Sequence, residues 1–329
     1  MTDSAPNTAK PFDDIRALVE SMPHHDDKAP AAVQQAFDSY SPALSAFGNL
    51  GPALRWLAGW QAKMPPSIDR PLVAVFAGTH GVASEYTSGD PVDIAKKRVR
   101  GLTERKAAVR GIAGSYGAAF KVYEMGVEYP SANLTKEASL SERDCAAAIA
   151  FGMEVVAEGA DIIVLGNAGF GSATAAAAIA RGLYGGAAEY WAGGRDASAS
   201  ARIEAVKKGA ELQKDHLFDP LDVLRCFGGR DIAGLMGAII AARHQSIPVI
   251  LDGYVVCAAA AVLHRLDPNA ISHCYAGHIS SEPAHGALLD RMGLTPLMGF
   301  EIGIGDGTGG ALAMGTLKAA ASGLRTIME

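Results

Sequence analysis

The segment Asp161-Ile-Ile-Val-Leu-Gly-Asn-Ala-Gly-Phe-Gly-Ser-Ala-Thr174 decides the fold class of this chain. Its first half is a short, continuously apolar run, which is typical of a strand buried on both faces of a parallel sheet. Glycines follow at 166, 169 and 171, and the Ala-rich residues 173–182 predict a helix. We therefore expect a strand that passes through a tight turn directly into a helix.

The same alternation recurs along most of the chain. Apolar runs that end near a glycine predict strands at 72–78, 119–127, 161–166, 248–253 and 271–277. Ala-rich segments between or after them predict helices at 95–115, 141–158, 173–182, 201–216, 231–242 and 255–266. Asp219-Pro220 is a typical helix start, with a capping carboxylate followed by proline. The pattern predicts an α/β fold with a mostly parallel sheet and helices on both faces.

Composition narrows the class of protein. The 329 residues carry a net charge of −6, which argues against binding to nucleic acid or to an anionic membrane. Residues 1–14 lack the basic and apolar segments of an export signal, and no apolar run is long enough to span a bilayer, so we expect a cytoplasmic protein. No cysteine pair has the C-x-x-C spacing of a zinc site, and we expect reduced thiols, no metal and no cofactor; the cysteines are Cys145, Cys226, Cys257 and Cys274.

Four glycine-rich or polar segments follow the predicted strands, at the edge of the sheet where ligands bind in such folds. The loop from Gly166 to Thr174 has the glycines and hydroxyls of a phosphate cradle, or is simply a tight turn with capping side chains. The loop from Ile302 to Gly310 holds Asp306 either for a ligand or as a helix cap. The other two segments are 278–285, with two histidines, and 76–81, where His80 follows a strand. No strand is followed by G-x-G-x-x-G, so a dinucleotide-binding dehydrogenase is excluded.

Taken in order, these segments resemble the nicotinate-nucleotide–dimethylbenzimidazole phosphoribosyltransferase family from about residue 45 to 325. The resemblance rests on residues 48–51, 78–81, 166–174, 219–224, 228–233, 248–253, 278–285 and 305–309. It implies transfer of phosphoribose from nicotinate mononucleotide to a benzimidazole-type aromatic base, in a homodimer or in a heteromer with a homologue. It also implies a large α/β domain at 66–310 and a small helical part at 1–65, completed by about 311–329.

The resemblance assigns roles to individual residues. Asp306 takes the place of the glutamate that the family uses as catalytic base, and Asn167 stands where the family has a second glutamate. The residues expected to bind the donor and its phosphate are Gly166, Asn167, Gly169, Gly171, Ser172, Thr174, Arg202, Asp252, Ser280, Ser281, Gly305, Gly307, Thr308 and Gly309. Those expected to bind the acceptor are His80, Ser88 and Lys97.

These departures from the family pattern leave two hypotheses open. An active enzyme would use Asp306 as its base, although a carboxylate set back by about an ångström can cost on the order of a hundredfold in rate. A nucleotide-binding paralogue without turnover would act as a regulator or as the partner of an intact homologue. The basic segment from Lys96 to Arg110 either faces the acceptor pocket or is a solvated or subunit-contacting helix face.

Overall fold

A central parallel sheet organises the molecule. The computed structural model describes residues 10–39, 47–104, 106–194 and 197–329. Within them, five strands hydrogen-bond in the order β2-β1-β3-β4-β5, and every neighbouring pair is parallel. The strands are β1 (Pro71–Ala77), β2 (Ala119–Glu124), β3 (Ile162–Asn167), β4 (Val249–Leu251) and β5 (Cys274–Ala276). All five overlap the predicted runs, and the α/β fold is confirmed.

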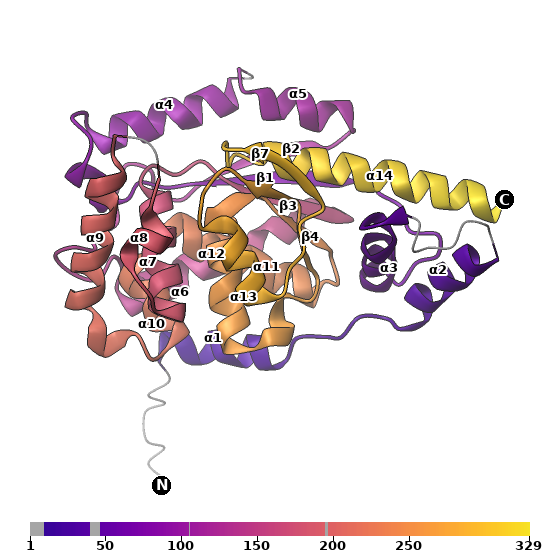
Figure 1. Ribbon diagram of the computed structural model, residues 1–329, viewed down its shortest axis with the longest axis horizontal. Coiled ribbons are helices and arrows are strands. Elements are labelled where there is room, and N and C mark those ends of the chain that lie inside the picture. Colours follow the sequence, from indigo (N-terminus) through magenta and orange to yellow (C-terminus); the bar gives the residue numbers. More distant parts are fainter. Residues whose placement is uncertain (1–9, 40–46, 105, 195–196) are drawn as a thin grey trace, which may run out of the picture.

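Helices cover both faces of the sheet (Figure 1). Side chains of β1 alternate between the faces, because successive residues of a strand point in opposite directions. Leu72 and Phe76 join the core beneath α6 (Glu142–Gly152), α7 (Ser172–Tyr184), α11 (Arg230–His244) and α12 (Gly253–Leu266). Val73 and Val75 join the core beneath α2 (Lys28–Asp38), α3 (Leu50–Gln61), α5 (Ala108–Ser115) and α14 (Thr308–Met328).

The N-terminal helices are divided between these two cores. α1 (Pro11–Glu20) inserts Phe12, Ile15 and Val19 into the core on the α6 side. α2 and α3 pack instead beside α14, at the end of the molecule where the C-terminus lies (Figure 1). Within the helical part expected at 1–65 and 311–329, α2, α3 and α14 cover one face of the sheet, and α1 lies on the other core. The division into a large domain and a small helical part stays a prediction. Residues 1–9 and 40–46 of that part lie outside the described residues.

Several helix boundaries differ from the predictions. The helix expected at 95–115 is two helices, α4 (Pro91–Thr103) and α5, because Ala107 has an extended backbone that lets Val109 and Ala113 turn into the core. α10 (Pro220–Phe227) begins as predicted, with the Asp219 carboxylate accepting the Leu221 N–H. The sequence did not reveal a separate pair of strands, β6 (His278–Ser280) and β7 (Met298–Ile302), or α13 (His285–Met292) between them. The remaining α-helices are α8 (Ala188–Ala192) and α9 (Ala199–Leu212).

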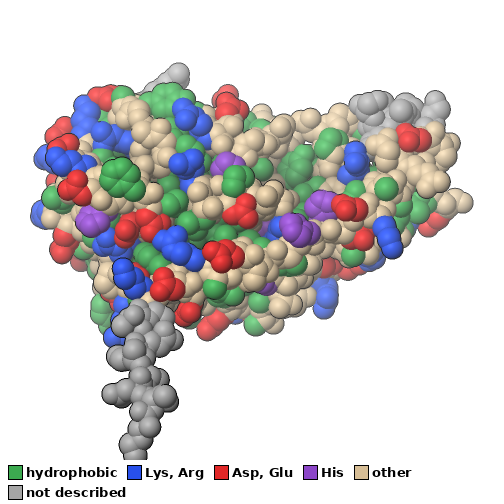
Figure 2. Space-filling model, turned by 90° about the horizontal axis from the view of Figure 1, so that it is seen from below, with side chains coloured by type: hydrophobic (Ala, Val, Ile, Leu, Met, Phe, Trp, Pro, Cys, Tyr) green, Lys and Arg blue, Asp and Glu red, His purple; other side chains and the backbone are tan. Residues whose placement is uncertain are grey.

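The surface shows no strong charge segregation on the face seen in Figure 2, where acidic and basic side chains are intermingled. None of the helices in the described ranges combines the length and the apolar character needed to cross a membrane. Among the same residues, no cluster of three or more His, Cys, Asp or Glu side chains is arranged to hold a metal ion.

Candidate active site

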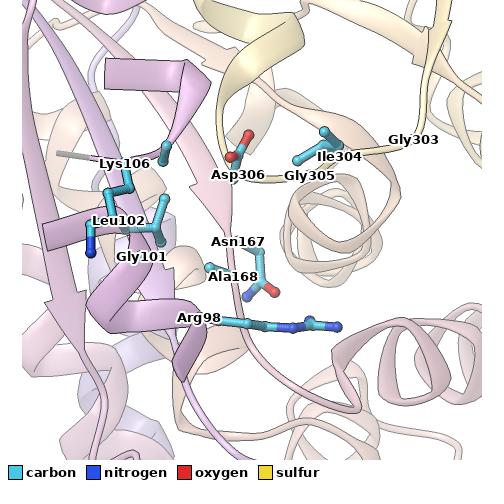
Figure 3. Close-up of a pocket in the computed structure, with 11 residues that line it drawn as sticks. Arg98, Gly101, Leu102, Lys106, Asn167, Ala168, Gly303, Ile304, Gly305 and Asp306 are labelled. Carbon is cyan, nitrogen blue, oxygen red and sulfur yellow. The ribbon is translucent and has the colours of Figure 1, made fainter. Parts of the chain in front are cut away.

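Two adjoining cavities lie beyond the carboxyl ends of β1, β3 and β4. The first cavity has a volume of about 420 Å³. One of its walls is formed by α4 and the loop after it, and another by the loop before α14; Figure 3 shows the lining residues. The second, of about 240 Å³, includes the first residues of α7 and of α12. Both cavities share Arg98, Asn167 and residues 303–305. A ligand with two parts can therefore occupy both at once.

The second cavity suits an anion. The first N–H groups of a helix have no acceptor within the helix, and the helix dipole adds positive potential there. Ser172 and Ala173 of α7, and Gly253 and Tyr254 of α12, bring two such helix starts into this one cavity. Helix starts of this kind can bind a phosphate group. The acidic residues Asp252 and Glu282 line the same cavity.

Asp306 is the carboxylate of the first cavity. Its Oδ1 accepts hydrogen bonds from the backbone N–H of Thr308 (3.2 Å) and from the Thr308 hydroxyl (2.6 Å). Within the described residues its second oxygen makes no hydrogen bond, which leaves it available to a ligand. Burial raises the pKa of the Asp306 carboxyl above its usual 3.8, and the charge of Asp252 acts in the same direction against the Thr308 hydrogen bonds. Both roles expected for Asp306, capping and ligand binding, are compatible with this geometry.

Asp252 holds the loop that carries Asp306. Its carboxylate accepts the N–H of Gly307 (2.8 Å) and of Gly310 (2.6 Å), and it pairs with His278 Nε2 at 3.0 Å. Gly307 has φ = +94°, a conformation that side chains rarely adopt, so the turn into α14 depends on this glycine. Asp252 was expected to bind the donor; it lines the second cavity, but both its oxygens are engaged by the protein itself.

A second buried aspartate lies behind Asn167. Asp231 is fully buried and accepts hydrogen bonds from His80 Nε2 (2.9 Å), Asn167 Nδ2 (2.8 Å) and Ser172 Oγ (2.8 Å). Burial by itself raises the pKa of this carboxyl, but the charge of His80 and the three hydrogen bonds outweigh it and lower the pKa to about 2. A side chain at Gly169 has no room here, because its Cβ would lie 2.2 Å from the Asp231 carboxylate. The cluster therefore fixes the side chain of Asn167, which faces both cavities.

Some residues expected to bind a substrate offer no free side-chain group to either cavity. The Thr174 hydroxyl is fully buried and pairs with Tyr86 Oη at 3.0 Å, and the Ser172 hydroxyl is taken by Asp231, so neither is free for phosphate. His80 is buried in the same cluster and lines neither cavity. Ser88 and Lys97 are exposed and line neither cavity.

The remaining expected residues lie close to the two cavities. Arg202, Ser280 and Ser281 line a neighbouring polar cavity of about 670 Å³, and Ser280 also lines the second cavity. Gly166 lies in β3 directly before Asn167, and Gly171 and Gly307 directly precede α7 and α14. Thr308 and Gly309 are the first two residues of α14. Gly169 and Gly305 line the cavities directly.

Two residues of the site were not singled out from the sequence. Arg98 stands in the basic run Lys96-Lys-Arg98, and nothing in that run indicates which side chain turns inward. Asp231 lies at the start of a helix, where an aspartate is common as a capping residue. Its position among the matched residues 228–233 was a signal that it has a role beyond capping. Arg105 lies outside the described residues; it belongs to the basic segment from Lys96 to Arg110, for which a pocket-facing and a solvated or subunit-contacting position were both open.

Comparison with known proteins agrees with this geometry. A family model described as phosphoribosyltransferase matches residues 22–329. The nicotinate-nucleotide–dimethylbenzimidazole phosphoribosyltransferase of Sinorhizobium medicae is 44% identical over 326 residues, covering 97% of this chain and 96% of the relative. The chain belongs to this phosphoribosyltransferase family. The resemblance inferred from the sequence is confirmed.

Two further relatives extend the comparison. The phosphoribosyltransferase of the same name from Brucella canis is 43% identical over 326 residues, covering 97% of this chain and 96% of the relative. A crystal structure of the corresponding protein from Thermus thermophilus superposes with a TM-score of 0.85 at 28% identity, covering 91% of this chain and 96% of that one. Family membership makes the chain a phosphoribosyltransferase.

Proposed function

We propose that this protein transfers phosphoribose from nicotinate mononucleotide to dimethylbenzimidazole or a related lower-ligand base. The products are α-ribazole phosphate and nicotinate. The observation that carries the proposal is the carboxylate of Asp306 in the first cavity, next to a second cavity built for an anion. Close relatives over nearly the whole chain are named for this reaction.

The division of the cavities supports the assignment of the two substrates. The helix starts of α7 and α12 provide unpaired N–H groups for the donor phosphate in the second cavity. Part of the wall of the first cavity is apolar, which suits a flat apolar base. The apolar residues are Leu102, Ala107, Ala168 and Ile304. Residues 303–305, shared by both, then lie where C1′ of the donor meets the acceptor nitrogen.

The chemistry requires little more than alignment and one base. The acceptor nitrogen forms a bond to C1′ as the bond from C1′ to the pyridinium nitrogen breaks, and nicotinate leaves with that electron pair. The positive charge of the donor ring already weakens the breaking bond. The acceptor must lose its N–H proton, and the free oxygen of Asp306 takes it. A raised pKa makes this carboxylate a better base at neutral pH than an ordinary aspartate.

One observation favours a second candidate, a nucleotide-binding paralogue without turnover. Asn167 cannot take up a proton, and its amide is held in place within the protein: Nδ2 donates to Asp231, and Oδ1 accepts the Gly169 N–H at 3.0 Å. The proton acceptor would then have to be Asp306, since both oxygens of Asp252 are engaged by the protein. A protein that binds nicotinate mononucleotide but releases no nicotinate would support this second reading.

Turnover is tested directly with purified protein, nicotinate mononucleotide and dimethylbenzimidazole, followed by chromatography for nicotinate and α-ribazole phosphate. Asp306→Asn keeps an oxygen for the Thr308 hydrogen bonds but removes the base, so we expect kcat to fall about 100- to 10,000-fold. Asp290→Asn, on the exposed side of α13, is the matched control and should retain wild-type kcat. Full activity in Asp306→Asn would refute the proposed role of Asp306.

Asp306→Glu separates the two hypotheses further. If the aspartate is merely set back from the reaction centre, the longer side chain should raise kcat. If the wild-type protein binds the donor by calorimetry but neither it nor Asp306→Glu shows turnover, the paralogue reading is favoured. The homodimer and the cytoplasmic location stay predictions; light scattering of the purified protein measures the first.

A further inference from the structure

Arg98 is an unexpected cation between the two cavities. It projects from α4 and lines both of them. Its guanidinium is held in place by a hydrogen bond from Nη1 to the Gly169 carbonyl (3.0 Å) and by the face of Phe170, whose ring centroid lies 5.0 Å from Cζ. In the view of Figure 3, Asn167 lies between Arg98 on one side and Asp306 on the other.

The charge of Arg98 has no acidic partner among the described residues. Three nearby basic side chains do have one: Lys96 pairs with Glu128, and Arg100 and Lys106 both pair with Glu104. A guanidinium has five N–H donors, of which the protein uses one here. Gly169, which accepts that bond, also leads into α7, so the cation lies beside a helix start that is itself electropositive. The acidic residues Asp252 and Glu282 line the same cavity, but both oxygens of Asp252 are engaged by His278, Gly307 and Gly310. The guanidinium N–H groups that the protein leaves unused can therefore bind an anionic ligand beside the start of α7.

We propose that Arg98 binds an anionic group of the nucleotide donor. This proposal rests on the proposed function, because that function places the donor in the second cavity. The donor carries two such groups, the phosphate and the ring carboxylate, and a guanidinium presents paired N–H donors that match either. Arg98 acts by binding and orienting the donor and takes no proton, since its side chain stays charged.

The test is equilibrium binding by calorimetry, without acceptor, for wild type, Arg98→Gln and Arg98→Lys. The probes are nicotinate mononucleotide, nicotinamide mononucleotide, which lacks the carboxylate, and nicotinate riboside, which lacks the phosphate. We expect Arg98→Gln to weaken nicotinate mononucleotide about 10- to 100-fold, and Arg98→Lys to restore part of the loss. Arg100→Gln, two residues away on α4 and lining neither cavity, is the control and should bind as the wild type does.

The probes distinguish the two anionic groups. If Arg98→Gln loses affinity for both mononucleotides but not for the riboside, Arg98 binds the phosphate. A loss shared by the two nicotinate compounds but absent for the amide assigns it to the carboxylate. Equal affinities of wild type and Arg98→Gln for every probe, or an equal loss in Arg100→Gln, would overturn the assignment while leaving the proposed function standing. If wild type binds none of the probes, the proposed function fails first, and the role of Arg98 fails with it.

Discussion

Replacing Asp231 by asparagine should destabilise the protein strongly, although the two side chains have almost the same shape. Lowering the pKa of a carboxyl from 3.8 to about 2 stabilises the folded state at pH 7 by roughly 2 kcal/mol, at about 1.4 kcal/mol per pKa unit. Asparagine also brings an NH₂ group into a site where His80, Asn167 and Ser172 all donate. At least one buried donor is then unpaired, at about 1–3 kcal/mol. We expect a total loss of about 3–5 kcal/mol, as for other broken buried ion pairs.

The measurement is equilibrium unfolding in urea at pH 7. Asp222→Asn is the matched control, because Asp222 pairs with Arg225 Nε at 2.8 Å but keeps 31% of its side chain exposed. The same chemical change there should cost less than about 1 kcal/mol. A loss below about 1 kcal/mol for Asp231→Asn would refute the reasoning, since it would mean that the buried charge does not hold the cluster together.

The pH dependence provides an independent check on the same residue. The folded-state pKa of Asp231 lies below its unfolded value, so the stabilisation is present above about pH 4 and is lost as pH falls towards 2. The difference in stability between wild type and Asp231→Asn should therefore be smaller at pH 3 than at pH 7. A difference that grows on acidification would contradict the assigned charge state.

Three further predictions concern the site. Burial raises the pKa of Asp306, so protonation of this carboxylate should begin to lower kcat/KM at a higher pH than it would for a free aspartate. A pH–rate profile that is flat down to pH 4 would exclude Asp306 as the base. Asn167→Glu would place a second carboxylate beside Asp231, where two charges about 4 Å apart repel by roughly 4 kcal/mol. We expect lower stability in urea, and a smaller cost of Asp231→Asn in this background than in the wild type; equal costs in the two backgrounds would contradict the repulsion. Asp252→Asn should loosen the loop that carries Asp306 and lower kcat about a hundredfold in steady-state assays, and an unchanged kcat would show that the loop holds without it.

The sequence by itself determined the sheet and the family. All five strands of the main sheet overlapped predicted runs. β1, β3 and β4 stand out between Ala-rich helices because strands buried on both faces are largely apolar, whereas β2 lies at the edge of the sheet and is mostly exposed or half-buried. The glycine-rich turns at 166–171 and 305–309 could also be predicted from the sequence, because close backbone packing and positive φ leave few alternatives to glycine. These features depend on local chain properties, which a single sequence records.

Only the tertiary structure decided which polar side chains face the cavities. Lys96, Lys97 and Arg98 are consecutive and equally basic, yet adjacent helix residues point about 100° apart, and packing of α4 turns Arg98 alone of the three into both cavities. Ser172 and Thr174 looked like phosphate ligands, but their hydroxyls are taken by Asp231 and Tyr86, residues 59 and 88 positions away in the chain. A hydrogen-bond partner so distant in sequence leaves no local pattern, because the fold alone brings the two groups together.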